Sequence, residues 1–264
     1  MSVSASQGLD TEGFILTVAQ VPVQAEYQSV LADACSLLSQ QTLGLDGLYV
    51  YGSVARGDAT PGQSDLDLTL VLREPQTPQV AEQLERVRRE LERRHPHVTK
   101  VDFDIGERAQ VMAVENRNLW GFWLKHQCRC IWGNDLCVHF ERFRPCREIA
   151  LALNGDVYSV LNSYICAIGQ TVIEADRLRL QREASRKLIR ATQILRSEAA
   201  TMWPQTLEEH VAMFLQSHPA MVTQVAFFLF EARNPGAAGD QFCARLQVFV
   251  EWLVSQQRET LLRT

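Results

Sequence analysis

The residues whose types and spacing could do chemistry lie in one segment, residues 48–72, LYVYGSVARGDATPGQSDLDLTLVL. Asp65 and Asp67 are two residues apart in a β-rich run, so strand alternation places both carboxylates on one face, about 7 Å apart. Like charges at this spacing repel each other unless a cation lies between them. Carboxylate oxygens are ligands that Mg²⁺ prefers, and Mg²⁺ commonly bridges them to substrate phosphates. The pair therefore predicts a Mg²⁺ site.

A third carboxylate is available in residues 98–105, VTKVDFDI. Alternation places Val101, Phe103 and Ile105 on one face of this expected strand, and Asp102 and Asp104 on the other. Either acid, joined to the first pair, would allow two metal ions to be held, one at the attacking oxygen and one at the phosphates.

Gly52 and Ser53 precede the acids and suit a phosphate. A glycine at a strand end lets the backbone approach a phosphate closely, and a serine can begin a short helix whose free N–H groups attract anions. Together with the acids, this corner predicts a phosphoryl-transfer site. Arg56 is a further candidate for phosphate contact, with a merely solvated turn arginine as the alternative.

The elements that must position these residues follow from hydrophobic spacing. Before residue 143 helices and strands alternate, and Thr77 with Pro78 marks a helix start that His95-Pro96 ends. Helices are expected at 25–41, from 78 and around 118–126, and strands at 48–51, 66–72 (half buried), 98–105 and 128–132. From about residue 148 the spacing is helical throughout, in segments near 156–182, 184–201, 206–217, 219–233 and 240–262. We expect a mixed α+β domain over residues 1–145, its first 24 or so residues an extension, and an all-α helical bundle over residues 146–264.

The pattern Tyr51-Gly52-Ser53, eleven intervening residues, then Asp65-Leu66-Asp67-Leu68 resembles the signature of the DNA polymerase β-type nucleotidyltransferase superfamily. The segment GSVARGDATPGQSDLDL is especially similar to the prokaryotic branch that contains aminoglycoside adenylyltransferases and the minimal nucleotidyltransferases of toxin–antitoxin pairs. The resemblance implies a small mixed sheet with flanking helices, followed by a substrate-binding helical domain.

The resemblance also implies residue roles. Gly52 and Ser53 would hold the nucleoside triphosphate, and Asp65 and Asp67 would ligate Mg²⁺. Asp102 matches the family's third acidic position, where it would complete the metal site and act as general base on the acceptor hydroxyl. Asp104, on the same strand face, leaves an alternative assignment two residues further on.

A basic stretch lies in the helical half, at residues 177–196. Lys187 and Arg190 are three residues apart, so one helical face can present both to a triphosphate. A solvated face paired with acids elsewhere in the fold is the alternative. In the run RVRRELERR at 86–94 the arginines alternate with glutamates, which predicts an exposed helix face.

Composition excludes several classes of protein. The 264 residues include 26 basic and 31 acidic side chains, for a net charge of −5, which disfavours binding nucleic acid by bulk electrostatics. No apolar run is long enough to span a membrane, and MSVSASQGLD has neither a basic n-region nor an apolar core, so we expect no signal peptide. Seven cysteines without paired C-x₂-C spacing favour free thiols in a reducing cytoplasm over disulfides or zinc.

The expected function is a cytoplasmic, Mg²⁺-dependent transfer of a nucleoside monophosphate, AMP from ATP, to a hydroxyl of an acceptor, with release of pyrophosphate. An aminoglycoside-like acceptor would need acids to meet its amines, and the candidates are Glu141, Glu148, Asp156 and Glu174. A protein or tRNA acceptor is one alternative. A non-catalytic nucleotide-binding or antitoxin-like interaction module is another.

Overall fold

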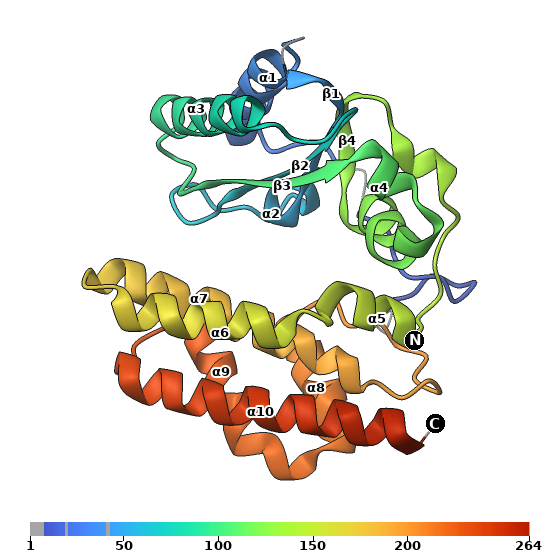
Figure 1. Ribbon diagram of the computed structural model, residues 1–264, viewed down its shortest axis with the longest axis vertical. Helices are drawn as coiled ribbons and strands as arrows, with labels where there is room; N and C mark the ends of the chain where they lie inside the picture. The colour runs from blue at the N-terminus through green and yellow to red at the C-terminus, as the bar shows by residue number, and fades with distance from the viewer. Residues whose placement is uncertain (1–7, 19–20, 41–42, 264) are drawn as a thin grey trace, which may run out of the picture. The chain divides into compact units, whose positions relative to one another are not determined.

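The computed structural model describes residues 8–18, 21–40 and 43–263. By its internal contacts the chain divides into two compact units, which we call the sheet unit and the helical unit (Figure 1). The sheet unit comprises residues 15–143, and the helical unit comprises residues 1–14 and 144–264. The expected amino-terminal extension falls partly outside the described residues, and residues 8–14 group with the helical unit.

The sheet unit is built on a four-stranded mixed sheet with the order β3-β2-β1-β4. Strand β1 pairs antiparallel with β2 and with β4, whereas β2 and β3 run parallel. The strands are β1 (Leu45–Tyr51), β2 (Leu66–Leu72), β3 (Val101–Glu107) and β4 (Arg129–Gly133). The parallel pair requires a crossover, which α3 (Pro78–Arg94) supplies.

Helices α1 (Ala25–Leu38) and α3 pack beside each other on one face of the sheet (Figure 1). Their buried residues, among them Tyr27 and Leu84, join the inward side chains of the strands in one core. Thr77 caps α3 as the sequence predicts, because its Oγ1 accepts a hydrogen bond from Val80 N at 3.3 Å. The sheet unit is completed by α2 (Gly52–Arg56), α4 (Arg108–Met112) and short helical turns at 114–116, 117–121, 123–127 and 136–139.

Strand β2 is more buried than its sequence pattern predicts. All its residues except Asp67 are at least nine-tenths buried, so the expectation of a half-buried strand is wrong. The opposite face of the sheet from α1 and α3 is also covered, since Trp123 Nε1 donates a hydrogen bond to Thr69 Oγ1 at 3.0 Å.

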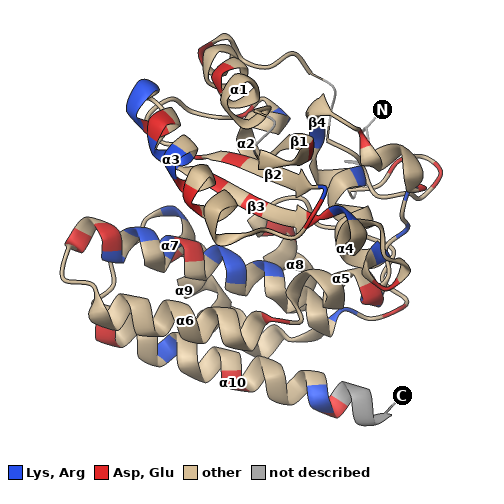
Figure 2. Ribbon diagram, turned by 45° about the horizontal axis from the view of Figure 1, so that its top comes forward, with Lys and Arg blue, Asp and Glu red and all other residues tan. Residues whose placement is uncertain are grey.

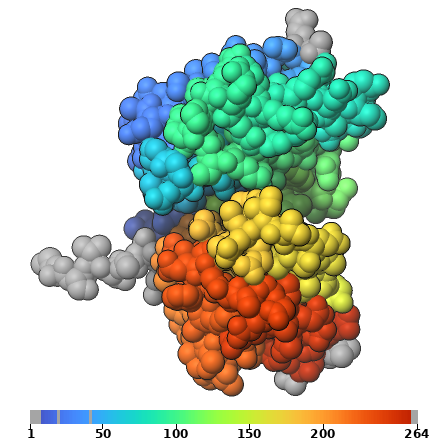
Figure 3. Space-filling model, turned by 90° about the vertical axis from the view of Figure 1, so that its left-hand side faces the viewer, coloured from blue at the N-terminus to red at the C-terminus, as the bar shows by residue number. Residues whose placement is uncertain are grey.

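Helix α3 lies at the surface of the sheet unit (Figure 3), and Figure 2 shows the basic and acidic residues that it carries, as predicted. Arg88 lies 2.7 Å from a carboxylate oxygen of both Glu85 and Glu92. Glu90 pairs with Arg93 and Arg94. These arginines are engaged within their own helix, as the alternation with glutamate predicts.

The helical unit is all α, as predicted. Its helices are α5 (Arg147–Asn154), α6 (Val157–Gln170), α7 (Glu174–Ala191), α8 (Leu207–Ser217), α9 (Val222–Arg233) and α10 (Gly239–Arg263). They enclose a separate core that includes Phe228, Phe242 and Phe249. The expected helices at 156–182 and 184–201 are wrong, because the break falls at residues 171–173 and α7 runs through the expected gap at 183.

Among the described residues, no helix combines the length and apolar character needed to cross a membrane. All seven cysteines are free.

Candidate active site

The glycine-serine corner follows the end of β1. Gly52 has φ of 70°, in the left-handed region that favours glycine. Helix α2 begins there and ends after one turn at Gly57, whose N–H donates to the carbonyls of Ser53 and Val54. The short helix predicted at Ser53 is therefore present, and its contact with phosphate stays a prediction.

This corner lies directly against an acid of the neighbouring strand. Tyr51 and Asp67 are register partners in the antiparallel pair of β1 and β2. A Cβ added to Gly52 would overlap Asp67 Oδ2, so a side chain at position 52 would displace the carboxylate. The absence of a side chain at position 52 thus lets the Asp67 carboxylate lie directly against the backbone of this corner.

The parallel pairing of β2 and β3 aligns the remaining acids. Asp67 is the register partner of Asp102, and Thr69 that of Asp104. Because paired residues on neighbouring strands share a face, Asp67 and Asp102 lie side by side. Asp65 immediately precedes β2, and Asp104 lies one step further into the sheet.

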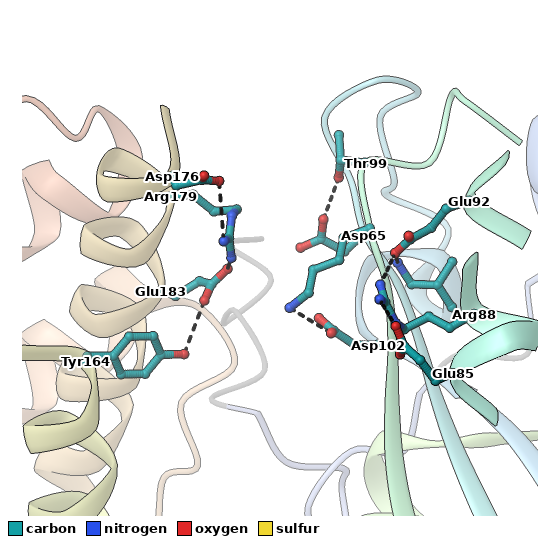
Figure 4. A network of polar contacts seen from close by, with 12 residues as sticks. Asp65, Glu85, Arg88, Glu92, Thr99, Asp102, Tyr164, Asp176, Arg179 and Glu183 are labelled. Carbon is teal, nitrogen blue, oxygen red and sulfur yellow. Dashed lines mark hydrogen bonds and ion pairs between the residues drawn. The ribbon is translucent and has the colours of Figure 1, made fainter. Parts of the chain in front are cut away.

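Asp65 and Asp102 have polar partners in the segment that leads into β3 (Figure 4). Thr99 Oγ1 donates a hydrogen bond to Asp65 Oδ1. Lys100 Nζ lies 2.7 Å from Asp102 Oδ1 in an ion pair. Backbone bonds fix this segment beside β2, since Thr99 N donates to Ser64 O at 3.2 Å and Leu66 N donates to Lys100 O at 2.8 Å.

Asp104 has a different environment from Asp102. Asp104 is exposed to water within β3, yet partial loss of solvation raises the pKa of its carboxyl and the charge of Asp102 adds to this, while a hydrogen bond from the Tyr51 hydroxyl opposes it. The pKa of Tyr51 is itself raised, first by burial and then by the charges of Asp104 and Asp67. The Tyr51 ring packs edge-on against Trp123 at 4.8 Å between centroids. The surroundings of Asp104 therefore disfavour its ionisation.

The donor types of this row fit Mg²⁺, because carboxylate oxygens are its preferred protein ligands and Asp67 and Asp102 come from paired positions of neighbouring strands. Within the part of the chain that the structure describes, however, no three side chains among His, Cys, Asp and Glu are grouped so as to hold a metal ion. In the arrangement described, Asp65 is bonded to Thr99 and Asp102 to Lys100. The predicted metal ligands Asp65, Asp67 and Asp102 are thus neighbours in the fold, and ligation stays a prediction.

The basic residues predicted to meet phosphate have acidic or buried neighbours within their own units. Arg56 Nε lies 3.2 Å from Asp58 Oδ2, and its side chain is 52% exposed. On α7, Lys187 Nζ lies 2.9 Å from Asp156 Oδ1. Arg190 is exposed, and its charge contributes to the lowered pKa of His210. Phosphate contact by Arg56, Lys187 and Arg190 stays a prediction.

The helical unit holds a further polar network, on α6 and α7. Arg179 pairs with Glu183 at 3.0 Å and with Asp176 at 3.7 Å, and the Tyr164 hydroxyl donates to Glu183 at 3.3 Å (Figure 4). Much of the basic stretch on α7 is therefore balanced by acids nearby in the same unit.

The sequence analysis gave no role to Lys100 or Thr99, and it included Tyr51 only as part of the motif. The signal for Lys100 was its position two residues before Asp102, at a spacing that brings side chains to one strand face. The contact of Tyr51 with Asp104 depends on the pairing of three strands, so neither local segment reveals it.

The comparisons with known proteins agree with this geometry. Residues 32–117 match the family model of the nucleotidyltransferase domain. These residues include the glycine-serine corner and all four acids, so the chain carries a nucleotidyltransferase domain and is a transferase of the EC 2.7.7 type. The superfamily resemblance and the predicted fold class are confirmed.

Among solved structures, the chain is similar to the spectinomycin adenyltransferase AAD(9) from Enterococcus faecialis, crystallised with ATP and spectinomycin. The match has a TM-score of 0.55 and 13% sequence identity, and it covers 87% of this chain and 98% of that one. At this identity the likeness shows a common fold. No curated protein sequence matches the chain.

Proposed function

We propose that the protein transfers AMP from ATP to a hydroxyl group of a small, amine-bearing acceptor and releases pyrophosphate, with Mg²⁺ as cofactor. The observation that supports this most is the contact of Gly52 with Asp67 beside Asp102. A backbone corner open to phosphate and two paired carboxylates are the parts that this reaction needs. ATP as donor is supported by the nucleotide in the similar adenyltransferase structure.

In this mechanism Gly52 and Ser53 bind the phosphates of the donor, and Asp65, Asp67 and Asp102 would hold Mg²⁺. The bound metal would make the acceptor oxygen more acidic and neutralise charge on the leaving pyrophosphate. Asp102 accepts the proton of the acceptor hydroxyl at a carboxylate oxygen. The hydroxyl oxygen then bonds to the α-phosphorus as the bond from that phosphorus to pyrophosphate breaks.

We assign the third carboxylate to Asp102 because its register partner is Asp67. Asp104 pairs with Thr69 and bonds to the Tyr51 hydroxyl.

The proposed acceptor class is an aminoglycoside-like or aminocyclitol compound, by analogy with the spectinomycin in the similar structure. Of the four acids suggested for its amines, three lie near basic groups: Glu141 with Arg117 at 3.8 Å, Asp156 with Lys187 at 2.9 Å and Glu174 with Arg177 at 3.4 Å. The pKa of Glu148 is lowered, chiefly by hydrogen bonding to its own backbone N–H at the start of α5, and the charge of Arg147 contributes. All four acids therefore stay candidates for an amine.

The test is incubation with each α-labelled nucleoside triphosphate and Mg²⁺, in separate reactions with a panel of aminoglycosides and aminocyclitols, total tRNA, or lysate protein. Label from ATP on a small amine-bearing acceptor supports the proposal. Label on tRNA or protein would show that the acceptor belongs to that class and is not a small molecule. If the protein shows neither transfer nor Mg²⁺-dependent ATP binding, a non-catalytic module is favoured.

A further inference from the structure

Lys100 occupies a position for which neither the motif nor the proposed reaction gives a role. Its Nζ lies 2.7 Å from Asp102 Oδ1, and the two side chains are 35% and 38% exposed. Asp67 is the register partner of this acid, and Asp104 follows it on the same face. The Lys100 ammonium group therefore lies beside a row of carboxylates and offsets part of their mutual repulsion.

We propose that Lys100 is the counter-cation of this acidic row when no metal is bound, and that it competes with the divalent ion for Asp102. This inference rests on the proposed function in one respect, the use of Asp102 as a metal ligand. Lys100 would position Asp102 and regulate the affinity for the metal, and it takes no part in the bonds that form and break.

The geometry around Lys100 supports an exchangeable contact. The pair is partly open to water, so the ammonium group can leave the carboxylate without being stranded in an apolar core. The backbone at Lys100 is held in place by its bond to Leu66 N, so that only the four-carbon side chain has to move. Asp65 is held differently, by the neutral Thr99 hydroxyl, which does not neutralise charge.

Competition predicts that removing the ammonium group strengthens metal binding. We expect Lys100→Met to bind Mn²⁺, used as the probe for the divalent site, about 1.5-fold to fivefold more tightly than the wild type, which is the range of a partly exposed ion pair. The free Mn²⁺ signal in electron paramagnetic resonance measures this without any substrate. In the absence of metal, Lys100→Met should melt at a lower temperature than the wild type. Mg²⁺ should raise the melting temperature of Lys100→Met by more than it raises that of the wild type.

Two comparisons separate direct competition from a general change of charge. Lys125→Met removes a lysine of the same unit whose Nζ lies 3.2 Å from the carbonyl of Cys137, and it should leave Mn²⁺ affinity close to that of the wild type. In an Asp102→Asn background, Lys100→Met should no longer change Mn²⁺ affinity. The reason is that Asp102→Asn has already removed the charge with which Lys100 pairs.

Equal Mn²⁺ affinity of the wild type and Lys100→Met would overturn the role of Lys100 while leaving the proposed function intact. An increase that persists in the Asp102→Asn background would also overturn it. If neither the wild type nor Lys100→Met binds Mn²⁺, even with ATP present, both this inference and the metal-dependent function are wrong.

Discussion

Gly52 and Asp67 are in such close contact that no side chain at position 52 fits beside the Asp67 carboxylate. The contact arises because β1 pairs antiparallel with β2, with Tyr51 opposite Asp67. Two parts of the motif that are fifteen positions apart in the sequence thereby form one corner. We propose that the phosphates of the donor nucleotide bind at this corner.

Gly52→Ala should impair both folding and transfer. Alanine at this positive φ costs about 1–2 kcal/mol in backbone strain, and its Cβ would in addition overlap the Asp67 carboxylate. Urea unfolding and the labelled-ATP assay measure the two effects. Gly62→Ala is the matched control, because Gly62 has φ of 75° and nothing near its added Cβ. If Gly52→Ala is no less stable than Gly62→Ala and transfers normally, the proposed role of the corner is wrong.

Asp102→Asn and Asp104→Asn should differ, and the difference tests the choice of the third carboxylate. The first should abolish transfer. The second should retain most of it, since the amide oxygen of the substituted side chain can still accept a hydrogen bond from the Tyr51 hydroxyl. Loss of transfer only in the Asp104→Asn protein would move the assignment to Asp104.

The pH dependence of stability should also distinguish Asp104. A carboxyl whose pKa is raised on folding destabilises the folded state once it ionises. Asp104→Asn should therefore increase the free energy of unfolding at pH 7, and the increase should shrink as the pH falls through the raised pKa toward the ordinary value of 3.8. Chemical denaturation at several pH values gives this difference, and a gain that grows toward low pH would contradict it.

His126 should make the sheet unit sensitive to acid. It is 1% exposed, its Nε2 accepts a hydrogen bond from Phe143 N at 2.9 Å, and burial is the main cause of its lowered pKa. As the pH falls, His126 is protonated in the unfolded state before it is protonated in the folded state. Its contribution to the free energy of unfolding is therefore present above pH 6.5 and is lost as the pH falls below that value. The slope of unfolding free energy between pH 7 and 5 should be smaller in His126→Gln. Exposed His139→Gln serves as the control, and equal slopes in the wild type and His126→Gln would refute the assignment.

Thr77→Ala should destabilise the protein by about 1 kcal/mol without changing transfer. The Thr77 hydroxyl satisfies Val80 N at the start of α3, and its loss leaves that donor to water. Thr77→Ser, which keeps the hydroxyl, should restore most of the stability in urea unfolding. Equal stability of the alanine variant and the wild type would show that the cap contributes nothing.

Local signals in the sequence predicted β2 and α3 well, since Thr77-Pro78 and His95-Pro96 mark both ends of the helix. They failed where no such signal exists. Residues 171–173 end α6 without glycine or proline, and β1 begins at Leu45, before the strand expected at 48–51. Alternation identified the acids, whereas the pairing of Asp67 with Asp102 required the parallel register of two strands separated by α3. The ion pair of Lys100 depends on a side-chain conformation, which spacing alone does not specify.

The most direct test of the central claim is transfer of label from α-labelled ATP by purified wild type and Asp67→Asn, with Mg²⁺ and the acceptor panel. We predict transfer by the wild type, and none by a folded Asp67→Asn protein, because an amide is a poorer ligand for Mg²⁺ than a carboxylate. Transfer by a folded Asp67→Asn protein at the rate of the wild type would contradict the account.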